Sequence, residues 1–163
     1  MYSATIPPMT RGLTALSNIL SKAEAHCAAT GIDPATLTTF RLFPDMLNFA
    51  RQVHLSCDFA ARAAARLSGD EVPSFPDVET TLPELRDRIA RTLVYIGGVD
   101  AEGFKGAEER EIVLNRRGGE MRLSGTDFLT LYALPQFYFH MTTAYNILRH
   151  NGVVLGKRDF MGV

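Results

Sequence analysis

Two histidines of this chain are placed where an imidazole could ligate a metal ion. The sequence has four histidines, and two of them, His54 and His140, fall on the apolar faces of long predicted helices. Imidazoles that point inward from two facing helices of a bundle can bind a divalent transition metal such as zinc or nickel. His26 and His150 lie near predicted helix C-termini, where an imidazole favours the negative end of the helix dipole, and they need no functional explanation.

Polar neighbours extend these histidines into a candidate pocket. Gln136 precedes His140 by one helical turn, and Asp58 follows His54 by one turn. A lone histidine among apolar residues is more often a hydrogen-bonded core residue, and aromatic stripes at helical spacing are usually core as well. Because the polar residues occur together, a polar pocket is nevertheless a reasonable expectation. Two aromatic residues of the last predicted helix are further candidates to line it, Phe137 and Tyr145.

The number of ligands separates two interpretations of this pocket. A transition-metal site normally needs three protein ligands. The pattern supplies two good nitrogen donors, His54 and His140, and Gln136 is a poor ligand for zinc or nickel. The ligand count therefore favours a metal-free pocket for a small molecule over a metal centre.

Helical periodicity predicts the elements that position these residues. Apolar residues at the helical period predict long helices over about 10–30, 45–67, 81–97 and 124–151. Thr10 and Asp45 are expected N-caps of the first two. Asp33 followed by Pro34 predicts a short helical turn. Pro135 lies inside the last helix and predicts a kink, because it lacks an amide donor and clashes with the preceding turn. The tail 153–163 is expected to be extended.

A β-hairpin is expected before the last helix. The segment EIVLNRRGGEMRLS, residues 111–124, has two short runs on either side of a glycine-containing tip. Together with the long helices, it predicts an all-α fold: an antiparallel four-helix bundle with a short β-hairpin before the last helix, formed as one domain over residues 1–163.

Charge and composition exclude several classes of partner. The formal net charge is −1, with 46% hydrophobic and 21% charged residues. Such a balance predicts neither nucleic-acid binding nor a polybasic membrane surface. No apolar run approaches the roughly 18 residues of a membrane span, and the start lacks the pattern of a secretory signal. We expect a cytoplasmic protein.

Two motifs carry a resemblance that covers essentially the whole chain. They are PxFPDVExT, at residues 73–81, and FHxxxAYxILRHNG, at residues 139–152. With these motifs the sequence resembles the DUF1993 family, which is related to the DinB/YfiT-like metalloenzymes. The resemblance implies a DinB-like four-helix bundle that is frequently dimeric. In DinB-like proteins three histidines commonly hold a divalent metal, and their positions correspond here to His54, Gln136 and His140.

Two functional hypotheses follow from the residues and the resemblance together. The first is a DinB-like bundle with a degenerate metal-site pocket that binds a small ligand and acts as a homodimer. The alternative is a divalent-metal-dependent enzyme, of the hydrolase or thiol-transferase type, that uses His54 and His140 with Gln136 or Asp58. The sequence identifies neither a substrate nor a catalytic residue.

Overall fold

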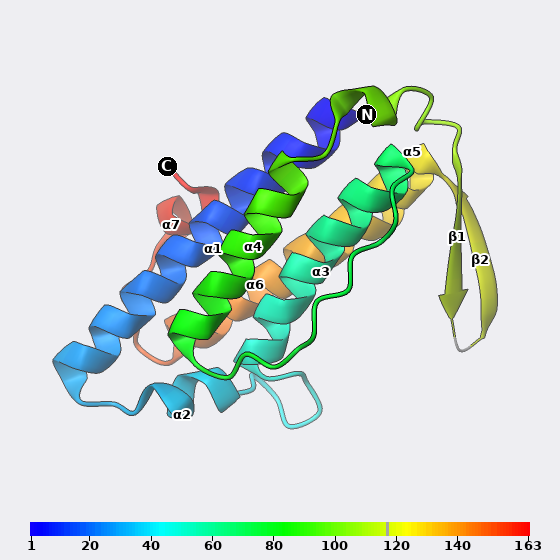
Figure 1. Ribbon diagram of the computed structural model, residues 1–163. Coiled ribbons are helices and arrows are strands. Elements are labelled where there is room, and N and C mark those ends of the chain that lie inside the picture. The colour runs from blue at the N-terminus through cyan, green and yellow to red at the C-terminus, as the bar shows by residue number, and fades with distance from the viewer. Residues whose placement is uncertain (117) are drawn as a thin grey trace.

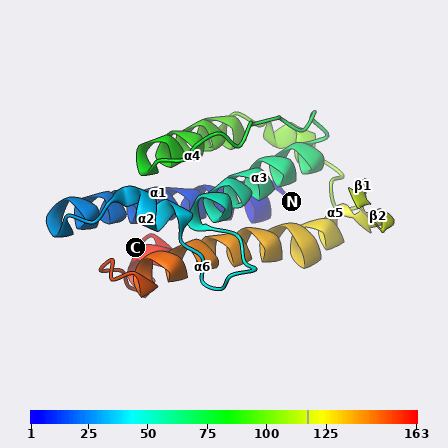
Figure 2. The same ribbon diagram turned by 90° about the horizontal axis from the view of Figure 1, so that it is seen from below.

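Four long helices form the body of the molecule (Figure 1). The computed structural model describes residues 1–116 and 118–163. The bundle helices are α1 (Tyr2–Thr30), α3 (Phe49–Ser68), α4 (Leu82–Gly97) and α6 (Leu134–His150). Two short helices, α2 (Pro34–Thr39) and α7 (Lys157–Met161), accompany them. The predicted helical bundle with a hairpin before its last helix is confirmed in outline, and Figure 2 shows the helices packed side by side.

The connection between α3 and α4 runs back along the bundle. Helix α3 packs against α6 and α4, and α1 packs against α4. Residues 69–81 return along α3 before α4 begins, so that α3 and α4 run in the same direction, whereas α1 and α6 run the opposite way (Figure 1). The short helix η1 (Ala101–Phe104), which follows α4, accordingly lies against the end of α3: a Cβ on Gly103 would be 2.9 Å from the Ser68 carbonyl oxygen.

Side-chain caps explain most of the helix boundaries. Thr81 and Glu84 form a capping box at the start of α4, and this helix begins where the sequence predicted. Helix α3 begins later than predicted, because Asn48 and not Asp45 accepts a hydrogen bond from the amide of Arg51. Gly69 ends α3 in the left-handed conformation, with φ of 86°.

Helix α1 begins a full two turns earlier than predicted. The sequence indicated Thr10 as its cap, but the helix begins at Tyr2 and includes Pro7 and Pro8. Pro7 and Pro8 lie in the second turn, where their missing amide donors carry a cost, and the burial of Ile6 and Met9 in the core offsets it. Tertiary packing therefore outweighs the local signal of the two prolines.

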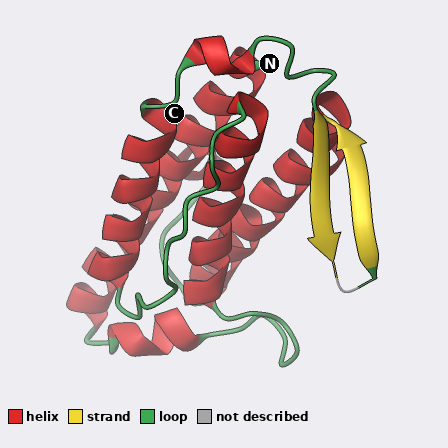
Figure 3. Ribbon diagram, turned by 45° about the vertical axis from the view of Figure 1, so that its right-hand side comes forward, coloured by secondary structure: helices red, strands yellow, loops and turns green. Residues whose placement is uncertain are grey.

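The predicted hairpin is present and leads directly into the last helix. Strands β1 (Glu111–Arg116) and β2 (Gly119–Ser124) pair antiparallel, with Ile112 opposite Leu123. Position 117, in the predicted tip, lies outside the described residues. The pair of strands stands beside the helices rather than within them (Figure 3). Its inner residues Ile112 and Leu114 are buried, which attaches the hairpin to the core.

A π-helical segment directly precedes Pro135, the position where the sequence predicts a kink. Helix α5 (Gly125–Asp127) is followed by the π-helix η2 (Phe128–Ala133), and α6 begins at Leu134. Pro135 therefore lies inside a helical run that continues from Gly125 to His150, directly after the π-helical turn that would otherwise accept a hydrogen bond from its amide. Such π segments are rare and frequently lie at functional sites. The tail also differs from the extended chain predicted, because Lys157–Met161 forms α7.

Apolar side chains of all four bundle helices form one continuous core. The core is rich in leucine and alanine, and the alanine face of α3 allows its neighbours to approach closely. No helix of residues 1–116 and 118–163 is long and apolar enough to cross a membrane.

Candidate functional site

His140 is held in a fixed orientation by a side chain of α3. Its Nδ1 lies 2.7 Å from Oε1 of Gln52, and both residues are buried. The amide of Gln52 is itself oriented, because its Nε2 donates a hydrogen bond to the Leu47 carbonyl oxygen at 3.0 Å. Since Oε1 can act as an acceptor alone, Nδ1 of His140 carries the proton.

This tautomer leaves Nε2 of His140 as an unprotonated acceptor. Burial lowers the pKa of His140 below its ordinary value of 6.5, so the imidazole is neutral at pH 7. Among the described residues no hydrogen-bond partner reaches Nε2, and that atom is not sealed from solvent. A neutral imidazole with one nitrogen fixed and the other accessible can accept a proton or a hydrogen bond from a bound molecule.

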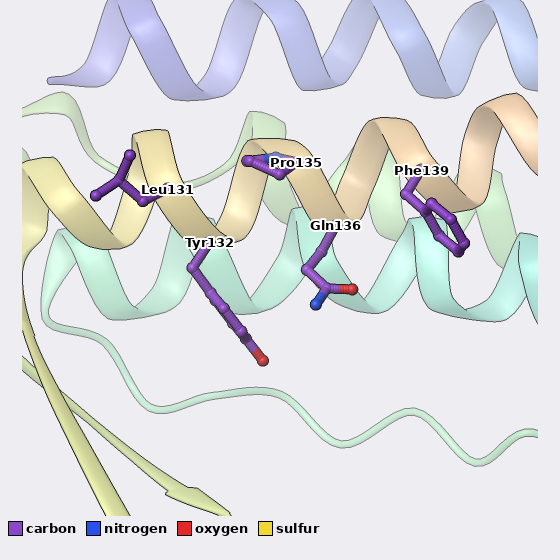
Figure 4. Close-up of a pocket in the computed structure, with 5 residues that line it drawn as sticks. All are labelled: Leu131, Tyr132, Pro135, Gln136 and Phe139. Carbon is purple, nitrogen blue, oxygen red and sulfur yellow. The ribbon is translucent and has the colours of Figure 1, made fainter.

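A shallow pocket of about 390 Å³ begins one helical turn before His140. Figure 4 shows Tyr132 and Gln136 pointing the same way from η2 and α6, with Phe139 one turn further on. The polar amide of Gln136 therefore lies on an otherwise apolar surface. Leu131 and Pro135 complete the lining.

Stacked and edge-on aromatic rings connect this pocket to His140. The ring of Phe59 lies nearly parallel to the imidazole, with centroids 5.6 Å apart and an interplanar angle of 11°. Tyr132 meets the same Phe59 ring edge-on at 5.9 Å, and Phe139 meets His140 edge-on at 5.2 Å. Ring pairs in these geometries are favourable and limit the freedom of the imidazole.

His54 lies in a different environment from His140. Its Nε2 is 3.2 Å from Oε2 of Glu79, and its Nδ1 is 3.8 Å from Oδ1 of Asp77. Burial lowers the pKa of His54 and outweighs the two carboxylates, which act in the opposite direction. Both carboxylates belong to the segment 70–81, which packs on the side of α3 away from α6.

A fully buried arginine organises the surroundings of His54. Arg88 of α4 donates to Oδ1 of Asp58 at 2.6 Å and to the Pro76 carbonyl oxygen at 2.9 Å. Its guanidinium carbon lies 5.0 Å from the ring centroid of Phe75. Its Nη1 lies 3.6 Å from Oε2 of Glu79. These contacts fasten the segment 70–81 to the bundle.

The structure therefore does not bring His54 and His140 together. Residues 52 and 54 point about 200° apart around α3, because each helical residue turns by about 100°. His140 engages Gln52 on one side of α3, whereas His54 engages Glu79 and Asp77 on the other. No hydrogen bond, ion pair or ring contact joins the two imidazoles within the described part of the chain.

The other predicted pocket residues also separate. Asp58 binds Arg88, and Phe137 is buried in the core beside Gly12, where a Cβ would lie 2.8 Å from the Phe137 ring. Tyr145 packs edge-on against Phe160 of α7, with ring centroids 5.8 Å apart. Of the predicted residues, Gln136 and His140 thus remain near one another on one helix.

Sequence reasoning missed two residues that shape the site. They are Gln52, which orients His140, and Phe59, which stacks on its ring. Gln52 and Phe59 are seven residues apart and therefore lie on the same face of α3. This spacing is the one feature of the sequence that could have indicated that the two act together. Their pairing with His140 depends on how α3 packs against α6, which residue spacing along one helix does not determine.

The geometry around the histidines does not fit a three-ligand metal centre. In the residues that the structure describes, no three His, Cys, Asp or Glu side chains cluster in a way that could hold a metal ion. Arg88 beside His54 carries a permanent positive charge that opposes an added cation. Metal binding by His54, His140 and Gln136 remains a prediction that metal analysis can test.

Comparison with known proteins agrees with this architecture. The family described as a domain of unknown function, DUF1993, matches residues 1–161. A crystal structure of a DinB family member protein from Shewanella denitrificans is 41% identical, with a TM-score of 0.94, over 99% of this chain and 92% of that chain. No protein with a curated description matches. The chain belongs to the DUF1993 family and shares the fold of the DinB family.

Proposed function

We propose that this protein binds a small, partly apolar molecule beside His140. The observation that carries the proposal is the fixed imidazole, whose Nε2 remains an accessible acceptor while Gln52 binds Nδ1. The ligand contributes a hydroxyl or N–H group that donates to Nε2. Its apolar part packs on the pocket lined by Tyr132, Gln136 and Phe139.

The composition of the pocket defines the ligand further. Aromatic and aliphatic side chains form most of the lining, and the Gln136 amide supplies both a donor and an acceptor. Ligand pockets generally combine a large apolar area with a few placed polar groups. A volume of about 390 Å³ lies near the lower end of the range for such sites. A small aromatic alcohol or a molecule of similar size fits these properties.

Phenol is a suitable probe, because it combines an aromatic ring with one hydroxyl donor. We expect phenol to shift the imidazole ¹⁵N resonance of His140 Nε2 in an NMR titration. The resonances of His26, near the C-terminal end of α1, should stay unshifted. The Gln136→Ala variant should weaken the effect, and Thr142→Ala, an exposed change on the same helix, should not. Unchanged His140 resonances at millimolar phenol would contradict the proposal.

A homodimer formed through η2 and α6 is a further part of this proposal. Leu131 and Phe139 are 71% and 56% exposed, although both are large and apolar. A second copy seated on these side chains would remove them from water and close the pocket. Light scattering should give twice the chain mass for the wild type and a smaller mass for Phe139→Glu. A wild-type monomer at working concentration contradicts the dimer.

One observation favours a divalent-metal-dependent enzyme as a second candidate. Metal-ligating histidines usually donate their other ring N–H to a protein acceptor, as Nδ1 of His140 does to Gln52. A metal bound at Nε2, with Gln136 as a weak further ligand and with water, would serve hydrolase or thiol-transferase chemistry. The separation of His54 from His140 makes this the less favoured function.

A further inference from the structure

A second, smaller pocket adjoins the first and contains two arginines. It has a volume of about 150 Å³ and lies between α3, η2 and the β-hairpin. Tyr132 lines both pockets, so the two adjoin at this side chain of η2. Among the side chains that line it are Phe59, Arg62, Arg66, Asn115, Phe128 and Tyr132.

The charges in this pocket are not balanced. Arg66 forms no hydrogen bond or ion pair with a carboxylate among the described residues. Arg62 binds Asp58 at 2.8 Å, but Asp58 also accepts from Arg88 at 2.6 Å, so one carboxylate serves two guanidinium groups. None of the described residues that line the pocket is acidic.

The excess positive charge is unfavourable in the absence of an anion. Burial and the neighbouring charge of Arg62 both lower the pKa of Arg66. Both arginines are half-buried and lie one helical turn apart on α3. A bound anion would relieve this repulsion and would satisfy guanidinium donors that otherwise depend on water.

We infer that this pocket binds the carboxylate or phosphate group of a small molecule. The inference rests on the proposed function, because the rest of that molecule would pass Tyr132 and reach the pocket beside His140. Arg62 and Arg66 supply guanidinium groups that match an oxyanion, and Asn115 can donate from the hairpin side. The ligand is thus an organic acid or phosphate ester with an apolar or aromatic body.

The size of the second pocket agrees with a terminal group rather than a whole cofactor. An engineered cavity of about 150 Å³ in another protein holds one benzene molecule. The pocket here has a similar volume of about 150 Å³. It can therefore accommodate one carboxylate or phosphate together with the atoms next to it.

Calorimetric titration with two separate probes tests the inference. Sodium benzoate presents a carboxylate on an aromatic ring, and inorganic phosphate presents a phosphate without an apolar body. We expect the wild type to bind at least one of them, and Arg66→Gln to weaken that binding by about tenfold or more. Arg158→Gln, which changes an exposed arginine of α7, is the matched control and should bind like the wild type.

A second variant keeps the test decisive if Arg66→Gln fails to fold. Asn115→Asp places a carboxylate on an exposed strand position that lines the pocket, and it should also weaken anion binding. A wild type that binds neither anion at millimolar concentration overturns the inference. Binding that survives both Arg66→Gln and Asn115→Asp overturns it as well.

Phenol distinguishes this inference from the proposed function on which it rests. Phenol is neutral and reports on the pocket beside His140, whereas the anions report on Arg66. Binding of phenol without binding of either anion would contradict the anion site alone. Anion binding that depends on Arg66, with no effect of phenol on His140, would contradict the proposed function and support the anion site.

Discussion

Oε1 of Gln52 lies 2.7 Å from Nδ1 of His140 and joins α3 to α6 inside the bundle. The contact links the two helices that pack most extensively against each other. It fixes the tautomer of the imidazole, and it makes His140 a specific acceptor rather than one more polar group in the core. The chemistry of the site therefore depends on Gln52.

Replacing Gln52 should destabilise the protein. Gln52→Leu removes the acceptor for the buried Nδ1–H of His140, and an unsatisfied buried donor costs about 1–3 kcal/mol. Urea unfolding should show a loss of that size. Gln136→Ala is the control on the facing helix, because Gln136 is half-buried and lies at the pocket surface; its loss should stay within about 0.5 kcal/mol. Equal losses in the two variants contradict the role assigned to Gln52.

Arg88 should be among the most sensitive positions of the fold. Arg88→Met removes a guanidinium that has 0% exposure and leaves Asp58 and Glu79 buried without it. Breaking a buried ion pair on one side costs about 3–5 kcal/mol. Chemical denaturation should therefore give a large loss of stability.

The control for Arg88 lies two residues away on α4. Arg86 binds Glu24 at 3.1 Å, and the Arg86 side chain is 42% exposed. Exposed ion pairs contribute about 0–1 kcal/mol. Arg86→Met should therefore have little effect, and a loss as large as that of Arg88→Met would show that burial does not determine the energy of these pairs.

Stability should fall with decreasing pH partly because of His140. Its pKa in the folded protein lies below the ordinary value of 6.5 as a result of burial, so the unfolded chain binds the proton more readily. The contribution of the neutral His140 side chain to the free energy of unfolding is complete above about pH 6.5 and is lost as the pH falls through the pKa of the folded protein.

The His140→Asn variant isolates this contribution. The free energy of unfolding, measured from pH 8 to pH 5 in steps of about 0.5 pH unit, should decline less steeply for His140→Asn than for the wild type. His150→Asn, an exposed change at the end of α6, should follow the wild type. A decline that is identical in the His140→Asn variant and the wild type would rule out titration of His140 as its cause.

Metal analysis separates the two functional hypotheses. Protein purified without a histidine tag should contain as little zinc or nickel as a His54→Ala/His140→Ala double variant, since the two imidazoles face different sides of α3. Elemental analysis after dialysis provides the measurement. Stoichiometric metal in the wild type that is absent from the double variant would support the metal-dependent enzyme instead.

The fold could be predicted from local signals to a large extent, whereas the site could not. The Thr81 cap, Gly69 and the hairpin glycines act on adjacent residues, so the sequence shows them directly. The start of α1 was missed, because burial of Ile6 and Met9 compensates for two prolines. Such compensation depends on tertiary contacts.

The motifs that carried the family resemblance had a role that their sequence did not reveal. In PxFPDVExT, the carbonyl of Pro76 and the side chains of Asp77 and Glu79 surround Arg88 and His54. This motif fastens a long connection to the bundle. The sequence showed which residues share a helix face, but not which face of α3 meets α6, and His54 was consequently placed beside His140.

The position of the ring proton on His140 decides whether Gln52 leaves Nε2 free to accept a hydrogen bond from a ligand. Long-range ¹H–¹⁵N NMR distinguishes a protonated from an unprotonated ring nitrogen. At pH 7 we expect a neutral imidazole with the proton on Nδ1 and a lone pair on Nε2, and we expect phenol to shift the Nε2 resonance. A proton on Nε2 in the free protein, with no response to phenol, would contradict ligand binding at His140.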